Sequence, residues 1–157
     1  MNVGLFSLPV RFAMFPPIDI ASLAAYLRKR GHKVYARDFT IELPQDNDCD
    51  SGYWDPIIHQ RELYERHTKL VEQWVDYMLS VSLDAIGFSV WPSQCYFSLQ
   101  AARLIKEKKP SIKIVFGGPW CSHKKQGWNI ITNESVDFLV FGEGEETLRE
   151  IIEEGQH

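Results

Sequence analysis

Short apolar runs alternate along this chain with segments of helical periodicity, and this alternation limits the folds open to it. The runs lie at about 2–9, 33–39, 84–90, 112–118 and 137–144. Between and after them, residues 20–30, 93–109 and 145–154 repeat apolar side chains at helical spacing. Strands that alternate with helices pair as parallel sheets that are covered on both faces. The sequence therefore predicts an α/β fold with five parallel strands.

Right-handed crossovers between parallel strands leave few possible strand orders. The order that we predict is 2-1-3-4-5, which makes the fold flavodoxin-like, a Rossmann-like doubly wound sheet. With 157 residues the chain suits a single domain over 1–157. Within it, we expect a loop over 40–55, a long helix over 56–82 and a short helix over 122–133.

Composition narrows the class of protein and its partners. The net charge is −4, which disfavours a nucleic-acid platform, because such surfaces are normally basic. Three cysteines lie far apart without a CxxC pair, which is typical of a reducing cytosol rather than of a disulfide framework. No apolar run is long enough to span a bilayer. We therefore expect a cytoplasmic protein with no nucleic-acid or membrane partner.

The fold predicts where a ligand would bind. In open α/β sheets, ligands lie beyond the carboxyl ends of the strands, at the point where the strand order reverses. The loops that reach this edge are 8–18, 89–94, 117–123 and 142–146. Two of the apolar runs stop at glycines, in "IVFGG" and "LVFGEG", and glycine allows a ligand to approach bare backbone.

Each of these features also has a structural explanation. Gly117 and Gly118 suit a tight strand-to-helix turn, and Ser89 suits the entry to a helix. Glu143 suits the amino end of the last helix, where acidic residues are favoured. His123 is the one histidine expected at the ligand edge.

Several familiar sites are missing from the sequence. The first strand is followed by no GxGxxG motif, and the chain has no GxxxxGK[ST] or GxSxG motif. The third strand ends in Gly87-Phe88-Ser89 without the carboxylate that a phosphoacceptor receiver domain would need. These absences disfavour nucleotide phosphate loops of those kinds, serine hydrolases and receivers.

Four stretches in order carry a resemblance to a known family: "PPIDIASLAAYLRKRGHKVYARDF", "DAIGFSVW", "KIVFGGPW" and "DFLVFGEGEETLREII". Together they resemble the cobalamin-binding (vitamin B12) domain that precedes the barrel of cobalamin-dependent radical-SAM enzymes. The resemblance covers most of the chain except about 40–80. The region over 40–82 is thus either a docking surface for the rest of such an enzyme or an ordinary crossover.

The resemblance implies that a corrin ring lies over the carboxyl edge of the sheet and that its dimethylbenzimidazole tail enters the switch-point crevice. Ser89 would hydrogen-bond near the tail, Gly117 and Gly118 would leave room for it, and residues 142–144 would line the far side. The full set of cofactor-binding residues implied is Pro9, Phe15, Pro16, Ser89, Val90, Trp91, Gln94, Gly117, Gly118, Pro119, Gly142, Glu143 and Gly144. No residue is expected to be catalytic or to ligate a metal.

One departure from related corrinoid proteins concerns the cobalt ligand. Proteins of the methionine-synthase type carry Asp-x-His-x-x-Gly after the first strand, whereas residues 8–19 here contain no histidine. The resemblance therefore implies base-off cobalamin without a protein histidine below the metal. Trp91 or a residue of 11–15 is expected beneath the ring.

The resemblance also implies a larger enzyme. Members of this class present methylcobalamin to a radical-SAM barrel of the same polypeptide, which binds S-adenosylmethionine and a 4Fe-4S cluster. The CxxxCxxC motif of that barrel does not occur in these 157 residues. We therefore expect the chain to be either the amino-terminal, cofactor-carrying part of a methyltransferase, not catalytic by itself, or a stand-alone module.

Two other functions remain open at this stage. A flavodoxin-like module without a cofactor would dock on a partner, and its crevice would be filled or collapsed. A small flavin- or nucleotide-binding domain would need phosphate loops rich in Ser, Thr and Gly, in which residues 8–17 are poor.

Overall fold

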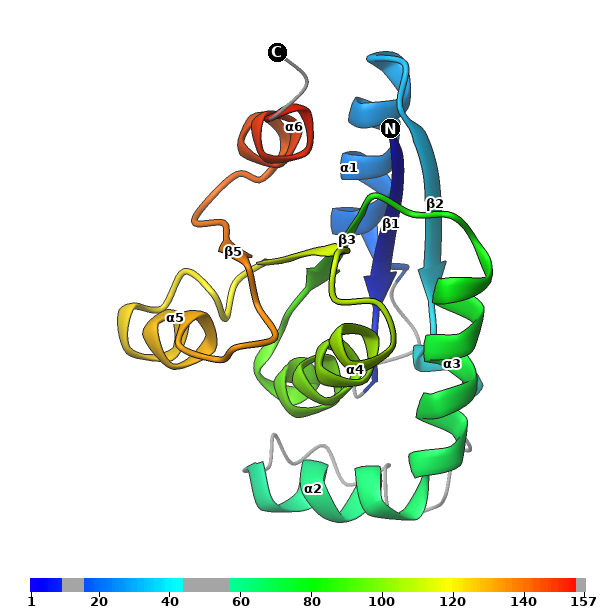
Figure 1. Ribbon diagram of the computed structural model, residues 1–157. Helices are drawn as coiled ribbons and strands as arrows, with labels where there is room; N and C mark the ends of the chain where they lie inside the picture. Colours follow the sequence, from blue (N-terminus) through cyan, green and yellow to red (C-terminus); the bar gives the residue numbers. More distant parts are fainter. Residues whose placement is uncertain (10–15, 44–56, 155–157) are drawn as a thin grey trace.

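The computed structural model describes residues 1–9, 16–43 and 57–154, and it confirms the predicted sheet. Five parallel strands pair in the order β2-β1-β3-β4-β5 (Figure 1). The strands are β1 (Asn2–Ser7), β2 (Lys33–Asp38), β3 (Ala85–Ser89), β4 (Lys113–Gly117) and β5 (Phe138–Leu139). The last strand is shorter than the predicted run over 137–144, because only Phe138 and Leu139 pair with β4.

Helices cover both faces of this sheet, as the alternation predicts. Helices α1 and α6 lie on one face, and α3, α4 and α5 lie on the other (Figure 1). The bounds are α1 (Ile18–Lys29), α2 (Ile57–Arg66), α3 (Thr68–Ser80), α4 (Cys95–Lys108), α5 (Lys124–Ile131) and α6 (Glu145–Glu153), with short 3-10 helices at Thr40–Glu42 and Pro92–Gln94.

The single long helix predicted over 56–82 is wrong, because the chain breaks at His67. This residue has φ −116° and ψ 20°, which is not helical, and it separates α2 from α3. Next to the break, the Thr68 hydroxyl donates to the carbonyl of Tyr64 at 3.0 Å. A side chain that bonds the backbone locally competes with a continuous helix. Helix α3 then packs Val71, Trp74 and Met78 into the core.

Alternation along the strands divides the interior into two cores. Phe6, Phe88 and Phe116 form one row across β1, β3 and β4, and all three are buried with the helices α3 and α4. Their ring centroids lie 6.4 Å (Phe6 to Phe88) and 5.3 Å (Phe88 to Phe116) apart. On the other face, aliphatic side chains from the strands pack against α1 and α6.

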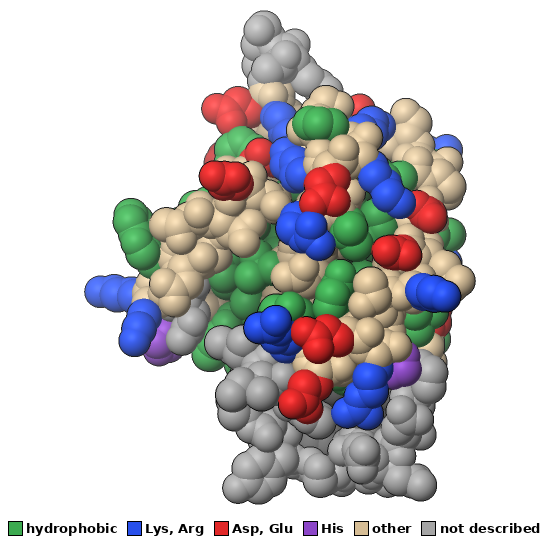
Figure 2. All heavy atoms as spheres, turned by 60° about the horizontal axis from the view of Figure 1, so that its bottom comes forward, with side chains coloured by type: hydrophobic (Ala, Val, Ile, Leu, Met, Phe, Trp, Pro, Cys, Tyr) green, Lys and Arg blue, Asp and Glu red, His purple; other side chains and the backbone are tan. Residues whose placement is uncertain are grey.

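The described surface carries charges of both signs. Figure 2 shows acidic and basic side chains interspersed with hydrophobic ones on one face of the molecule. Ion pairs among the described residues include Arg103 with Glu107 at 2.6 Å and Lys108 with Asp76 at 2.5 Å. Within the described ranges, no helix has the length and apolarity needed to cross a membrane.

Candidate functional site: a crevice at the carboxyl edge of the sheet

A cavity of about 250 Å³ opens between α1 and α6 at the carboxyl ends of β1, β3 and β4. This is the position where the strand order reverses and where the sequence predicts a ligand. We call this cavity the crevice. Its lining residues are Leu5, Ile18, Asp19, Ile20, Ser22, Leu23, Gly87, Phe88, Ser89, Val115, Gly117, Gly118, Val140, Gly142, Glu143, Gly144, Glu145 and Leu148.

The floor of the crevice is one row of residues across β1, β3 and β4. Leu5 pairs in register with Gly87, and Gly87 pairs with Val115. A Cβ on Gly87 would lie only 2.9 Å from the Cδ2 atom of Leu5. The Leu5 side chain thus lies over Gly87, and a side chain at position 87 would have to displace it.

Gly117 and Gly118, at the end of β4, are glycine for different reasons. A Cβ on Gly117 would meet only the Cβ of Val140, at an ordinary 3.7 Å, so the described residues leave this position open toward the crevice. Gly118 has φ +98°, and its Cβ would lie 2.8 Å from the backbone nitrogen of Val90. The chain itself thus requires glycine at 118, whereas at 117 it leaves space for another molecule.

The far wall of the crevice is formed by the turn from β5 into α6. Gly142 has φ +73°, a conformation that side chains disfavour, and its N–H donates to the Ser122 hydroxyl at 3.2 Å. Gly144 is the N-cap residue immediately before α6, and a Cβ there would touch Leu23 of α1 at 3.5 Å. This turn therefore holds the amino end of α6 close to α1.

The polar groups of the crevice are hydroxyls and carboxylates. Ser89 at the end of β3 is only 6% exposed, and its hydroxyl donates to a carboxylate oxygen of Asp19 in the first turn of α1. Across the mouth, Ser22 donates to Glu145 at 3.1 Å. With Glu143, three carboxylates line the crevice, and none of the lining residues within 1–9, 16–43 and 57–154 is a lysine, arginine or histidine.

Several predicted site residues support the crevice from outside it. Gln94 is fully buried, and its amide nitrogen donates to the Ser7 hydroxyl at 3.0 Å and to the Leu8 carbonyl at 2.5 Å. Its amide oxygen accepts from the Trp91 N–H at 3.2 Å. Gln94 thus ties the turn after β3 to the end of β1.

Val90 performs a similar role between β3 and β4. Its N–H donates to the Gly117 carbonyl at 2.8 Å, and its carbonyl accepts from the Trp120 N–H at 3.2 Å. The Val90 side chain is fully buried, and Trp91 beside it is half-buried. These contacts hold Gly117 and Ser89 side by side at the sheet edge.

The remaining predicted residues lie apart from the crevice lining. Pro9 is buried, Pro119 is exposed, and Pro16 lines a second, shallow groove between the start of α1 and the end of β2. The prediction for Phe15 falls outside the described residues. The structure therefore brings six of the predicted residues to the crevice: Ser89, Gly117, Gly118, Gly142, Glu143 and Gly144.

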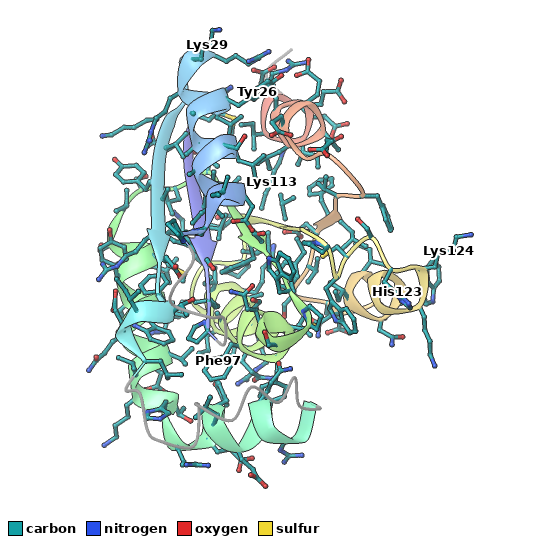
Figure 3. All side chains as sticks on the ribbon, turned by 180° about the vertical axis from the view of Figure 1, so that it is seen from behind. Tyr26, Lys29, Phe97, Lys113, His123 and Lys124 are labelled. Carbon is teal, nitrogen blue, oxygen red and sulfur yellow. The ribbon has the colours of Figure 1, made fainter. Side chains whose placement is uncertain are left out.

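The histidine and the cysteines near this edge do not line the crevice. His123 immediately precedes α5 and stacks on Trp120 at 6.0 Å between ring centroids, and Figure 3 shows it at α5, apart from α1. Burial raises the pKa of the Cys95 thiol to about 11 and that of Cys121 to about 12. Across the described residues, no three His, Cys, Asp or Glu side chains gather to hold a metal ion.

Sequence reasoning missed the contribution of α1 to the crevice. Asp19, Ser22 and Leu23 reach it because the helix packs against α6 and crosses the strand ends. A signal was available for Gly87, since an isolated glycine inside a strand marks a close approach. For Asp19 the only signal was an acidic residue in the first turn of a helix at the predicted edge.

Comparisons with known proteins give one matching family and solved structures with a similar fold. A family model described as the B12 binding domain matches residues 12–152. Two solved structures of TsrM, a radical S-adenosylmethionine methyltransferase from Kitasatospora setae, are similar to the chain at 15% sequence identity and a TM-score of 0.64. One holds a tryptophan substrate and the SAM analog aza-SAM, and the other holds cobalamin and a 4Fe-4S cluster.

The alignments cover nearly all of this chain but only a part of the TsrM chain. The alignment with TsrM covers 96% of this chain but 25% of the TsrM chain, so this chain spans about a quarter of the TsrM length. At that identity the likeness shows a shared fold. Among curated proteins, none matches the sequence.

Proposed function

The chain belongs to the B12-binding domain family, and on that premise we propose that its crevice receives the nucleotide base of a cobalamin. The corrin ring would lie outside, over the carboxyl edge of the sheet. The observation that carries this proposal is the open space between α1 and α6 above the row Leu5, Gly87 and Val115.

The size of the crevice fits one part of the cofactor. Cavities that take a whole drug-sized ligand measure roughly 300–1,000 Å³, and an apolar cavity of about 150 Å³ binds benzene. At about 250 Å³ the crevice is too small for a corrin ring and suits a bicyclic aromatic base. Leu5, Val115 and Leu148 supply apolar walls, and Ser89 and Asp19 supply polar atoms.

The residues that would hold the cofactor follow from this arrangement. Gly117 and residues 142–144 would lie against the base and the nucleotide, and Gly118 would keep the β4 turn in place. Pro9, Phe15, Pro16, Trp91 and Pro119 would border the ring, with Val90 and Gln94 positioning the turn beneath it. When bound, cobalamin would supply a methyl group carried on its cobalt.

We further propose that the cofactor binds base-off without a protein histidine. Residues 8–19 contain no histidine, and His123, which precedes α5, is not among the described residues that line the crevice. The likeness to TsrM supports a role within a longer radical-SAM methyltransferase whose barrel holds the S-adenosylmethionine and the 4Fe-4S cluster. The present chain would then carry the cofactor and would not perform catalysis by itself.

The alternatives fit the crevice less well. A flavin or nucleotide phosphate would face three carboxylates, with no basic side chain among the described lining residues, and like charges repel at this range. A docking module without a cofactor would have a filled crevice, whereas this one is open.

Filling the crevice tests the proposal. Gly117→Leu would place a side chain where the described residues leave room, and Ala25→Leu on the exposed side of α1 is the matched control. After mixing with hydroxocobalamin and desalting, the unaltered protein and Ala25→Leu should retain corrinoid, and Gly117→Leu should not. Electron paramagnetic resonance of the reduced Co(II) form should lack nitrogen hyperfine splitting from an axial base. Equal retention by Gly117→Leu, or no retention by the unaltered protein, would contradict the proposal.

A further inference from the structure

We infer that Gln60 on α2 is a positioning residue for the corrin ring, because it holds in place the turn 90–96 against which the ring would lie. This inference rests on the proposed function and deepens it. It gives a role to α2 (Ile57–Arg66), which belongs to the segment over 40–82 that the family resemblance does not cover. In this role, α2 supports the cofactor site from within the domain.

Helix α2 lies at the edge of the sheet where the ligand is expected. Figure 1 shows it beyond the end of the sheet toward which the arrows of β1 and β2 point. It contacts α4 and the 3-10 helix Pro92–Gln94, which both follow β3. Helix α3, by contrast, packs Val71, Trp74 and Met78 into the core and thus serves as the crossover helix. Helix α2 is therefore an addition at the carboxyl edge.

Aromatic packing fixes α2 against the start of α4. Tyr64 is 8% exposed, and its ring meets those of Tyr96 and Phe97 edge-on, with centroids 5.6 Å and 5.8 Å away. Edge-to-face pairs of this kind are favourable. They hold α2 close to the turn 90–96, so that a polar side chain one helical turn before Tyr64 reaches the backbone of that turn.

Gln60 is this side chain, and it uses both ends of its amide. It is only 5% exposed, its nitrogen donates to the Pro92 carbonyl at 3.0 Å, and its oxygen accepts from the Tyr96 N–H at 3.1 Å. Tyr96 lies in the first turn of α4, where backbone N–H groups have no partner within the helix. The N-cap residue of α4, Gln94, directs its own amide to Trp91 and to the end of β1. Gln60 thus caps α4 from outside.

The turn 90–96 is thereby held from two sides. Gln94 ties it to β1, and Gln60 ties it to α2. Trp91, which is expected to border the ring, lies directly before Pro92. A buried amide with both ends bonded favours one arrangement of its partners, and leaving those partners unpaired is costly. Gln60 is not among the described residues that line the crevice, so its contribution concerns the ring and not the base.

Gln60→Met keeps the length and the unbranched shape of the side chain and removes both hydrogen bonds. The turn then samples other arrangements, and the ring binds only the fraction of molecules in which the turn is in place. Cobalamin and cobinamide share the ring, so both should bind about fivefold more weakly to Gln60→Met. The ratio of their dissociation constants should stay unchanged. Equilibrium dialysis of both corrinoids measures these constants.

Two further measurements separate positioning from a loss of stability. Val71→Ala removes methyl groups from α3 in the same core, so it should lower the denaturation midpoint and leave both affinities unchanged. Amide hydrogen exchange reports on Tyr96 directly. Gln60→Met should accelerate the exchange of the Tyr96 N–H, and saturating cobinamide should restore its protection, because the bound ring holds the turn from the other side.

The outcomes separate this inference from the function on which it rests. Unchanged affinities of Gln60→Met, a loss confined to cobalamin, or an equal loss in Val71→Ala would overturn the role of Gln60 and leave the proposed function standing. Exchange at Tyr96 that cobinamide does not alter would do the same. Cobalamin binding without measurable cobinamide binding would also overturn it, because the ring would then have no binding surface of its own. Failure of the unaltered protein to bind cobalamin would overturn both.

Discussion

The two faces of the sheet are formed by residues that are neighbours along each strand. Phe6, Phe88 and Phe116 point to the α3–α4 face and fill it with rings, whereas Leu5, Gly87 and Val115, one position earlier, point to the α1–α6 face. The first row packs ring against ring, and the second leaves a cavity of about 250 Å³.

This difference teaches how one sheet can be both a stable core and a binding site. Successive side chains of a strand point to opposite faces, so stability and function can be encoded on alternate residues. The aromatic face supplies buried area, which stabilises the fold. The row Leu5, Gly87 and Val115 on the other face carries less side-chain volume than the three rings, and the crevice opens above it.

Removing a ring from the filled face should have the largest effect on folding. Phe88→Ala deletes a side chain that is 2% exposed, and we expect a loss of about 3–5 kcal/mol in the free energy of unfolding. Chemical denaturation measures this loss. Val115→Ala on the crevice face is the comparison, and it should cost clearly less. Similar losses for both variants would remove the distinction between the faces.

Gly117 and Gly118 at the end of β4 compare a position that is open to the crevice with one that is packed against the chain. Gly118→Ala forces a side chain onto φ +98° and against the Val90 backbone, and should cost about 1–3 kcal/mol. Gly117→Ala should change the free energy of unfolding by no more than about 0.5 kcal/mol, since its Cβ meets only Val140 at 3.7 Å. Denaturation of both variants tests this, and a large loss for Gly117→Ala would show that the crevice is not open there.

The smallest expected effect concerns the exposed polar contacts that join α1 to α6 above the crevice. A hydrogen bond from Tyr26 and the neighbouring Arg149 lower the pKa of Glu146 below its ordinary value of 4.5. This carboxylate therefore stabilises the fold above pH 4.5, and the contribution disappears as the pH falls through the lowered value. The melting temperatures of the unaltered protein and Glu146→Gln should differ slightly at pH 6 and converge near pH 3. A constant difference over that range would contradict the assignment.

Much of the fold follows from patterns in the sequence, and the exceptions have local causes. The five apolar runs and their order are confirmed, because buried parallel strands read as nearly continuous apolar segments. The break at His67 is not visible in the periodicity, since apolar residues continue at helical spacing on both sides. Likewise, β5 is short because pairing with β4 limits it, which no property of 137–144 indicates.

For the candidate site, glycines were the informative residues. Gly117, Gly118, Gly142 and Gly144 all lie at the crevice, as their position after apolar runs predicts. Asp19 was missed because its partner Ser89 is distant in sequence, and only tertiary packing of α1 brings the two together. The prediction that Gln94 binds the cofactor stays a prediction, and its amide is hydrogen-bonded within the protein.

The most direct test of the central claim compares cobalamin with cobinamide, which differ by the nucleotide and its base. Equilibrium dialysis of each corrinoid against the protein gives the two dissociation constants. If the crevice holds the base, cobalamin should bind about ten- to a hundredfold more tightly, the gain expected from burying one aromatic group. Gly117→Leu should reduce this ratio close to one. Equal affinities of the unaltered protein for the two corrinoids would contradict the account, because the crevice would then contribute nothing to binding.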